Sequence, residues 1–366
     1  MKKKVLISAP KYYGIDTDIQ ESFASLGFRT LLVNQIPLSI FERIAKKIGN
    51  KLPFLKPIVN QILKSYLINE NKEFVTIVSN DRPDLLIIIQ GDHVFPATIK
   101  TIRELVSCPI VSYIWDDPFN KHNNHDDYRK SNFKKGIPLY DFIFVFDTSY
   151  IDEIKRHGAK KVKYLPLATN PNRYKDISVT AQDRDDYGYD VCFIGVPFEN
   201  RVEIFERLHD YNLGVFGDHW TKYFIRKGQK TPFYYKGKAT GEIVNKIYLS
   251  SKIVLNIHHP QSIEGLNTRT FDIPACGAFE MVDYKKNVEK HFEIDKEMIT
   301  FRNINELKNK IDFYLKNDDL RKTISDRGKQ RVLNEHTWVH RANDLIAALK
   351  QSNCHSHSLK QQLNET

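Results

Sequence analysis

The sequence predicts an α/β protein with two doubly wound domains. Strand-like and helix-like segments alternate along the chain with short connections, which is typical of parallel sheets covered by helices on both faces. Residues 85–89 are an uninterrupted apolar run and residues 253–257 are apolar except for Asn256, as expected of strands buried on both faces. The chain has 366 residues, which is enough for two domains with separate cores.

In the first half of the chain, short apolar runs predict strands and apolar residues at helical spacing predict helices. The predicted strands are residues 5–8, 28–33, 85–89, 110–114, 140–146 and 162–165. The predicted helices are residues 16–26, 98–106 and 149–157. Residues 166–171 and the polar run 178–187 then interrupt the pattern, which indicates a linker.

The same alternation restarts after this interruption. The predicted strands are residues 190–194, 213–216, 253–257, 278–282 and 298–301, and the predicted helices are residues 201–210, 242–249, 305–315, 319–333 and 338–349, with one more from about residue 268. The predicted organisation is a first domain at 1–170, a linker at 171–187 and a second domain at 188–336. A closing helix at 337–350, which either stays with the second domain or packs on the first, and a flexible polar tail at 351–366 complete the chain. Two such domains leave a cleft, and ligands of open α/β sheets bind beyond the carboxyl ends of the strands.

Charge and composition narrow the choice of partners. The 55 Lys and Arg residues against 45 Asp and Glu give a net charge of +10, which favours anionic partners such as nucleotide phosphates or acidic lipids. No nucleic-acid recognition motif accompanies this charge, so we expect no nucleic-acid partner. No apolar stretch approaches the ~18 residues of a membrane span, which predicts a cytoplasmic protein.

Several enzyme classes lack their motifs in this chain. The four cysteines stand alone, and no histidine pair is accompanied by Cys or carboxylate residues at zinc-site spacing, so we expect no structural metal. The phosphate loop of P-loop enzymes and the glycine fingerprint of nicotinamide and flavin enzymes are both missing, and we expect no cofactor of these kinds.

A glycine turn follows the predicted strand at 190–194. Gly195 precedes a predicted helix with Asn200 as its N-cap and Glu203 as the capping-box partner. Arg201 in the first helical turn opposes the helix dipole, and an anionic ligand held by both would resolve this conflict. The alternative interpretation is an ordinary turn with a solvated arginine.

A second cluster of polar residues follows the predicted strand at 253–257. Glu264 lies in a loop, Asn267 suits the N-cap of the next helix, and Arg269 and Asp272 lie inside that helix. Carboxylates accept hydrogen bonds from sugar and ribose hydroxyls, and a guanidinium group binds phosphate with a fork of donors. On spacing alone, a surface Glu and a helix-face Asp remain the alternative.

The first domain offers candidates after two of its strands. Asp116 and Asp117 follow the strand at 110–114, where paired carboxylates act as general base and orienting group or simply form a turn before a proline. His93 follows the strand at 85–89 and either contacts a substrate or is an ordinary loop residue.

Residues 41–72 form a basic stretch with regularly spaced apolar side chains. One interpretation is a segment that lies on an anionic membrane surface, which would place the protein peripherally on the inner face of the membrane. The other, which the pattern favours, is a helical insertion that packs on the first domain and leaves a basic face in water.

Together, these segments make the chain resemble CgeB-like glycosyltransferases of group 1, which have the GT-B architecture of two Rossmann-like domains facing each other across a cleft. The resemblance spans nearly the whole chain. The matching motifs are Trp115-Asp-Asp-Pro118, Gly158-Ala-x-x-Val162 with Leu165-Pro166, Phe193-Ile-Gly195 with Arg201, Asn267-x-Arg269-x-Phe271-Asp272 with Gly277, and the segment from Leu320 to Arg341.

This resemblance implies a nucleotide-sugar donor, most simply a UDP-sugar, held by the second domain. Glu264 would face the donor sugar and pyrophosphate, and Asp272 the ribose, in the place of the family's pair of glutamates. Arg201 and Arg269 would neutralise the diphosphate without a metal, assisted by the turn at Gly195 and by Asn267. Catalytic candidates are Glu264 and, on the acceptor side, the residues His93, Asp116 and Asp117.

The implied function is sugar transfer to a saccharide or glycolipid acceptor in bacterial cell-surface glycan assembly. The spacing of Glu264 and Asp272 leans towards retention of the anomeric configuration. A sugar-nucleotide epimerase of similar fold and a non-catalytic two-lobed binding protein are the alternatives.

Overall fold

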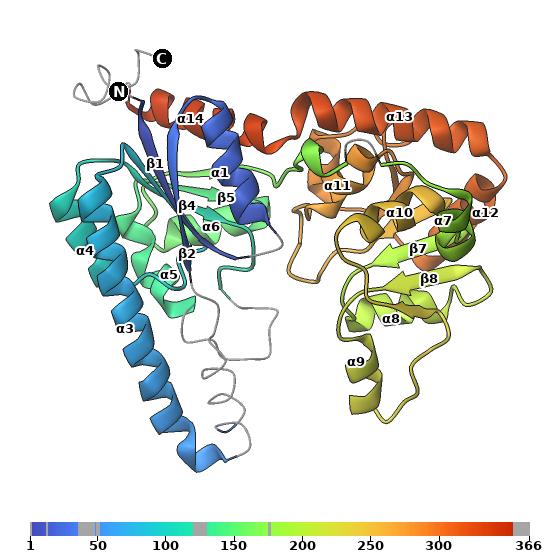
Figure 1. The fold of residues 1–366 in the computed structure, drawn as a ribbon, viewed down its shortest axis with the longest axis horizontal. Helices are drawn as coiled ribbons and strands as arrows, with labels where there is room; N and C mark the ends of the chain where they lie inside the picture. Colours follow the sequence, from blue (N-terminus) through green and yellow to red (C-terminus); the bar gives the residue numbers. More distant parts are fainter. Residues whose placement is uncertain are drawn as a thin grey trace. The chain divides into compact units, whose positions relative to one another are not determined.

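The computed structural model describes residues 2–11, 14–35, 48, 52–119, 130–174 and 177–353. The chain divides into two compact units: unit 1 contains residues 1–166 and 341–366, and unit 2 contains residues 167–340. Each unit is built on a six-stranded sheet with helices packed against it (Figure 1). The predicted α/β class with two doubly wound domains is confirmed. Most of the predicted tail, from residue 354 onwards, lies outside the described residues.

The sheet of unit 1 is entirely parallel, with the strand order β2-β1-β3-β4-β5-β6. Its strands are β1 (Lys4–Pro10), β2 (Arg29–Gln35), β3 (Leu85–Ile89), β4 (Ile110–Ile114), β5 (Phe142–Val145) and β6 (Val162–Tyr164). Every residue of β3 and β4 is buried, as predicted from the apolar run of β3 and from β4, which is apolar except for Ser112. The strand order reverses between β1 and β3, which is where such sheets bind ligands.

The helices of unit 1 include a long one that the sequence predicts only in part. They are α1 (Ile15–Ser25), α3 (Lys56–Asp81), α4 (Pro96–Leu105), α5 (Lys130–Gly136), α6 (Ile151–Arg156) and the main part of α14 (Trp338–Asn353), with short 3-10 turns at Pro53–Leu55, Ile137–Leu139 and Thr148–Tyr150. Within the basic stretch predicted at 41–72, residues 41–47 and 49–51 lie outside the described residues.

The sheet of unit 2 has the strand order β12-β11-β10-β7-β8-β9, again parallel throughout. Its strands are β7 (Val191–Ile194), β8 (Leu213–Phe216), β9 (Tyr235–Gly237), β10 (Ile253–Asn256), β11 (Glu280–Asp283) and β12 (Ile299–Phe301). The order reverses between β7 and β10. The sequence analysis did not predict β9, because three residues are too few to show a period.

Helices cover both faces of this second sheet. They are α7 (Ala181–Tyr187), α8 (Glu199–Glu206), α9 (Trp220–Arg226), α10 (Glu242–Ser250), α11 (Arg269–Cys276), α12 (Ile304–Leu315) and α13 (Asp318–Glu335). Alternate residues of β7 enter different cores: Phe193 packs with α8, α9 and α12, whereas Cys192 packs with α10 and α11. This alternation follows from the two-residue repeat of a strand.

Two local predictions need correction. The segment at 171–187, predicted as a linker, contains helix α7, which begins with a capping box between Thr180 and Asp183. The predicted cap of α8 is wrong: the N-cap residue is Phe198, and Asn200 lies inside the helix, where its amide donates to the carbonyl of His258 at 3.3 Å. The contact with the neighbouring loop outweighs the local capping preference of Asn200.

Candidate functional site

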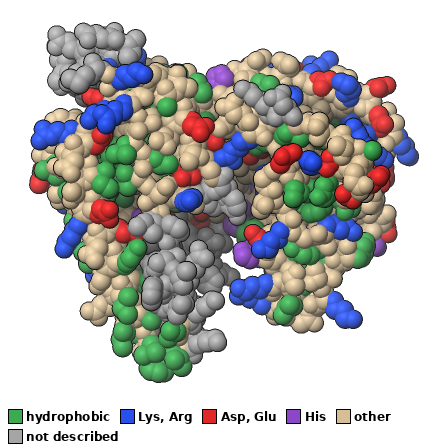
Figure 2. Space-filling view, in the orientation of Figure 1, with side chains coloured by type: hydrophobic (Ala, Val, Ile, Leu, Met, Phe, Trp, Pro, Cys, Tyr) green, Lys and Arg blue, Asp and Glu red, His purple; other side chains and the backbone are tan. Residues whose placement is uncertain are grey.

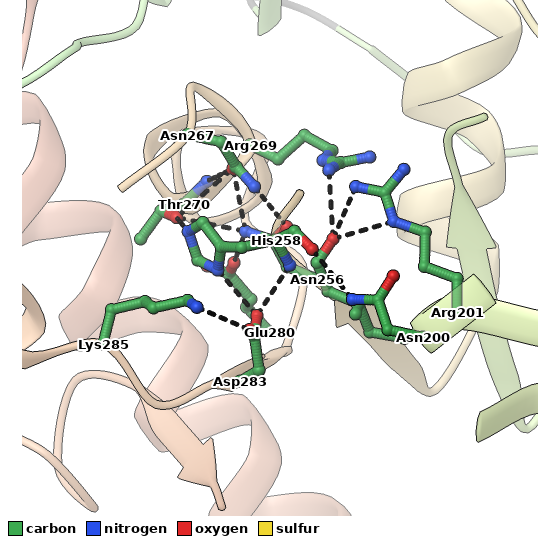
Figure 3. Close-up of polar contacts among 11 residues, drawn as sticks. Asn200, Arg201, Asn256, His258, Asn267, Arg269, Thr270, Glu280, Asp283 and Lys285 are labelled. Atoms are coloured by element: carbon green, nitrogen blue, oxygen red, sulfur yellow. Dashed lines mark hydrogen bonds and ion pairs between the residues drawn. The ribbon is translucent and has the colours of Figure 1, made fainter. Parts of the chain in front are cut away.

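The candidate site lies where the strand order of unit 2 reverses. The turn after β7 carries Gly195, and the segment after β10 runs from Ile257 to the start of α11 at Arg269. The carboxyl end of β11 contributes Asp283. Parallel neighbouring strands deliver these segments to one edge of the sheet, so residues far apart in the sequence meet there (Figure 3).

Two guanidinium groups converge on one backbone carbonyl at this edge. Arg201 donates from Nε and Nη2 to the oxygen of Ile257, at 3.1 and 2.7 Å, and from Nη1 to the oxygen of Val196 at 2.8 Å. Arg269 donates from Nη1 to the oxygen of Ile194 at 2.6 Å, and its Nη2 lies 3.4 Å from the same Ile257 oxygen. The structure therefore brings together the two arginines that the sequence singled out (Figure 3).

An aromatic ring and a glycine shape the space for both guanidinium groups. The Phe193 ring centroid lies 5.1 Å from Cζ of Arg201 and 5.3 Å from Cζ of Arg269, within cation–π range. A Cβ atom at Gly195 would clash with Nη1 of Arg269 and with the Phe193 ring. Gly195 is thus required to let Arg269 approach the backbone.

The two arginines differ in exposure. Arg201 is only 2% exposed, and backbone carbonyls occupy its guanidinium group. Arg269 is half-buried, and within the described part of the chain no carboxylate forms an ion pair with it. As the first residue of α11, it adds a positive charge to the positive end of that helix. Such a cation is well suited to hold an anion.

A buried amide network fixes the start of α11. Asn256 and Asn267 exchange hydrogen bonds, and Nδ2 of Asn256 also donates to Oε1 of Glu280 at 2.8 Å. Thr268 occupies the N-cap position one residue after the predicted cap, yet Oδ1 of Asn267 accepts from the backbone N–H of Thr270 at 3.2 Å. The predicted N-cap position is therefore wrong by one residue, although the side chain of Asn267 still accepts from an N–H of the first turn, and its amide is occupied within the protein.

Burial determines the charge states of this network. Glu280 is 4% exposed, and burial raises the pKa of Glu280 well above its ordinary value, so this side chain is a neutral acid. Burial lowers the pKa of His258, whose neutral ring donates from Nδ1 to Oδ1 of Asp283 at 2.6 Å. Burial opposes the charge on Asp283, but hydrogen bonds from His258 and the nearby Lys285 lower its pKa. Asp283 thus anchors the backbone that follows Ile257.

The two predicted donor-site carboxylates have separate surroundings. The Glu264 carboxylate lies 3.7 Å from Nζ of Lys286, and its backbone oxygen accepts from the N–H of Asn287. Asp272 accepts a 2.6 Å hydrogen bond from the hydroxyl of Thr169. Burial and the neighbouring Asp272 raise the pKa of Tyr174. Asp272 therefore accepts from hydroxyl groups of this chain, which is the kind of contact that the resemblance implies for the ribose hydroxyls of the donor.

Unit 1 has a cavity of about 100 Å³ at its own strand-order reversal. It is lined by Ser8, Val33, Asn34, Gln35, Glu70, Asn71, Glu73, Phe74, Ile77, His93 and Val94. His93 lies in this wall with its Nδ1 3.9 Å from Oε2 of Glu70. Asn71 fixes the loop, because it donates to the carbonyl of His93 and accepts from the N–H of Phe95.

The aspartate pair in unit 1 stabilises a turn. Asp116 accepts from the N–H of Asp117, whose own carboxylate accepts from the N–H of Phe119, both at 2.9 Å. Asp117 is fully buried. These contacts are those of a turn before a proline, which was one of the two interpretations of the motif, and Asp116 remains half-buried.

The sequence analysis missed Asn256, Glu280 and Asp283. Each lies at an end of a buried strand, and a polar residue at the edge of an apolar run was the available signal. Within the described ranges, no group of three or more His, Cys, Asp or Glu residues is arranged to hold a metal ion. No helix among the same residues is long and apolar enough to span a membrane.

Sequence comparisons give two matches. The sequence model of a family described as glycosyl transferase-like matches residues 201–347. The spore protein CgeB of Bacillus subtilis is 25% identical over 302 residues, which cover 78% of this chain and 88% of CgeB.

The fold also resembles solved structures at low sequence identity. HepE of Anabaena, crystallised with UDP-glucose, has a TM-score of 0.64 at 11% identity, over 95% of this chain and 99% of HepE. A UDP-forming trehalose-phosphate synthase from Burkholderia xenovorans scores 0.63 at 12% identity, over 94% and 98% of the two chains. Sucrose-phosphate synthase of Thermosynechococcus elongatus scores 0.60 at 12% identity, over 97% and 100%.

Proposed function

We propose that this chain, whose residues 201–347 match the sequence model of the glycosyl transferase-like family, transfers a sugar from a UDP-sugar to a saccharide or glycoconjugate in cell-surface glycan assembly. The observation that carries the proposal is the convergence of Arg201 and Arg269 on the Ile257 carbonyl, at the strand-order reversal of unit 2. The resemblance to CgeB-like glycosyltransferases is confirmed by the family match and the CgeB relative. HepE supports the choice of uracil nucleotide, because it was crystallised with UDP-glucose.

The two arginines have separate roles in this proposal. Arg269 contacts the diphosphate, since it is half-buried and has no described carboxylate partner. Arg201 positions the turn around Ile257, since its guanidinium group is buried on backbone carbonyls. The bond from the sugar to the β-phosphate breaks during transfer, and the negative charge that develops on the leaving UDP is stabilised by a cation already in place.

The remaining candidates take supporting roles. Asp272 receives the ribose hydroxyls, and Glu264 faces the donor sugar. The cavity of unit 1 accepts the saccharide, where His93 lies near Glu70 and orients the attacking hydroxyl. The proton of this hydroxyl passes to the departing diphosphate as the new glycosidic bond forms. The donor is a substrate, so the reaction uses no separate cofactor.

We further propose that transfer requires no metal, because fixed cations supply the charge at the diphosphate, and that it retains the anomeric configuration, as the spacing of Glu264 and Asp272 indicates. Chelation by EDTA is then expected to leave the transfer rate unchanged, and NMR of the first product is expected to show the donor's anomeric configuration. A rate that falls with EDTA and returns with Mg²⁺ would contradict metal independence, and an inverted product would contradict retention.

Calorimetric titration with UDP tests the donor site. Replacing Arg269 by Ala removes a charge-assisted contact, so we expect UDP affinity to fall about tenfold or more. Arg207→Ala, at the exposed end of α8, is the matched control and should bind as the wild type does. Unchanged affinity in Arg269→Ala would remove the role assigned to this residue.

Donor and acceptor are tested together by product analysis. With a UDP-sugar and an acceptor, we expect a glycosylated product and free UDP. With the donor alone, we expect an unchanged sugar configuration, because the proposal includes no epimerisation step. An isomerised donor in the absence of acceptor would favour the epimerase alternative instead.

A further inference from the structure

Helix α3 has two apolar stripes, of which only one is used for packing in unit 1. The buried stripe follows the helical repeat and consists of Val59, Leu63, Leu67, Phe74 and Val78. The second stripe, called here the outer stripe, is formed by Leu52, Phe54, Ile58 and Ile62, with exposed fractions of 43, 73, 57 and 57%. A cluster of large apolar side chains this exposed indicates a contact with something outside the chain.

Figure 2 shows this apolar surface at the amino-terminal end of α3. From Ile58 to Ile62 the outer stripe advances four residues, so the two side chains lie on the same side of the helix, one turn apart. Phe54, in the 3-10 turn before α3, is four residues from Ile58 and the most exposed of the set.

The charges around the outer stripe have a single sign. The sequence from residue 43 to 69 contains six Lys or Arg residues and no Asp or Glu, and Lys64 is exposed on α3 itself. The whole chain carries a net charge of +10. An apolar stripe whose neighbours in the sequence carry only positive charges is complementary to a bilayer surface with anionic headgroups, which attracts the lysines while the acyl boundary receives the apolar side chains.

We propose that the outer stripe of α3 docks this protein on an anionic membrane surface. Phe54, Ile58 and Ile62 enter the headgroup region, and Lys64 contacts lipid phosphate. The same helix continues into the wall of the unit 1 cavity through Glu70, Asn71, Phe74 and Ile77, about 18 Å further along the helix axis. If the proposed function holds, this docking brings the acceptor cavity close to a lipid-linked saccharide.

Vesicle flotation tests the docking with the full-length protein. Wild type should float with phosphatidylcholine vesicles that contain phosphatidylglycerol and stay unbound with phosphatidylcholine alone. In the double variant Ile58→Ser/Ile62→Ser, the partition coefficient between anionic vesicles and water should fall about tenfold or more, because neither side chain buries apolar surface in the lipid. Ile225→Ser, at an isoleucine of unit 2 that is 67% exposed, is the matched control and should float normally.

A charge variant and a size measurement complete the test. Lys64→Glu should reduce flotation on anionic vesicles, whereas Lys222→Glu on α9 should not. Binding that persists in the double variant, or that ignores lipid charge, would overturn the proposal. The proposal would also be overturned if the wild type failed to bind vesicles and sedimented as a dimer while the double variant sedimented as a monomer. Because flotation needs no nucleotide, its failure is distinct from a failure of UDP binding.

Discussion

Burial, rather than residue type, separates the roles of the charged residues in unit 2. Arg201 and Arg269 carry the same charge and contact the same carbonyl, but only the half-buried Arg269 retains access for a ligand. Glu280 and Asp283 are both acidic residues of β11, yet burial leaves Glu280 neutral while His258 and Lys285 keep Asp283 ionised. Each group takes the charge state that its neighbours stabilise.

The neutral state of Glu280 predicts a pH dependence of stability. The folded protein keeps a proton that the unfolded chain loses above pH 4.5, so this residue makes the protein less stable as the pH rises beyond that value. The variant Glu280→Gln has no titrating group at this position. The difference between its free energy of unfolding and that of the wild type should therefore increase by up to about 1.4 kcal/mol for each pH unit above pH 4.5. Urea unfolding between pH 4 and pH 8 measures the difference.

Two further variants complete this experiment. Glu280→Ala removes one of the buried acceptors of Nδ2 of Asn256, and its free energy of unfolding should be about 1–3 kcal/mol lower than that of Glu280→Gln at every pH. Glu203→Gln, at an exposed position of α8, should show no such trend. A difference between wild type and Glu280→Gln that stays constant from pH 4 to pH 8 would show that Glu280 is not held neutral.

At the scale of elements, caps and long-range contacts compete to set where a helix begins. Asn267 accepts a hydrogen bond from an N–H of the first turn of α11, because its contact with Asn256 lies beside the same end of the helix. Asn200 does not cap α8, because its amide reaches the loop after β10. In α7 the local signal dominates, since Thr180 and Asp183 form a reciprocal capping box next to Lys246.

The cap of α7 gives a prediction for unit 2. Thr180→Ala removes the hydroxyl that caps the helix and should lower the melting temperature by about 3 °C at pH 7. Hydrogen bonds from Thr180, with a contribution from Lys246, lower the pKa of Asp183 to about 2. The stabilisation is therefore present above the ordinary pKa of 3.8 and is lost as the pH falls towards 2.

Thermal melts at pH 7 and pH 2.5 measure both effects of this variant. The gap between wild type and Thr180→Ala should narrow at the lower pH. Thr180→Ser, which keeps the hydroxyl, is the matched control and should melt close to the wild type. An unchanged gap at both pH values would argue against the capping box.

At the scale of the molecule, the chain passes between its two units twice, after residue 166 and after residue 340. The last helix, α14, begins in unit 2 and continues in unit 1, where Ala342, Leu345, Ala348 and Leu349 are buried. Arg341 is buried there as well, and its charge acts on the phenols of Tyr113 and Tyr164. Unit 1 thus depends on residues from both ends of the sequence.

Truncation after residue 340 tests this dependence. Unit 1 should melt at a lower temperature, because several buried side chains are removed and the surface they cover is exposed. Unit 2 should keep its transition and its UDP affinity, since residues 167–340 contain the whole candidate donor site. Differential scanning calorimetry with and without UDP separates the two transitions. Truncation after residue 353 is the control and should leave both unchanged.

The sequence by itself determined the class of fold and most of the elements. Strands β3, β4 and β8 begin and end where the apolar runs predict, because a strand buried on both faces must be apolar throughout. The motif around Arg269 and Asp272 also indicated a resemblance to glycosyltransferases, and the sequence model of the glycosyl transferase-like family matches residues 201–347, which contain this motif. Local composition and spacing carry these properties, since they depend on neighbours in the chain.

Tertiary structure decided which of the candidate residues act together and in which charge state. The meeting of Arg201 and Arg269 at Ile257 depends on the strand order β10-β7, which no single segment encodes. The neutral Glu280 depends on burial beneath Asn256. The exposure of the outer stripe of α3 likewise follows from which face packs on unit 1. Burial and long-range contacts are properties of the folded chain, so they become visible only when its segments are brought together.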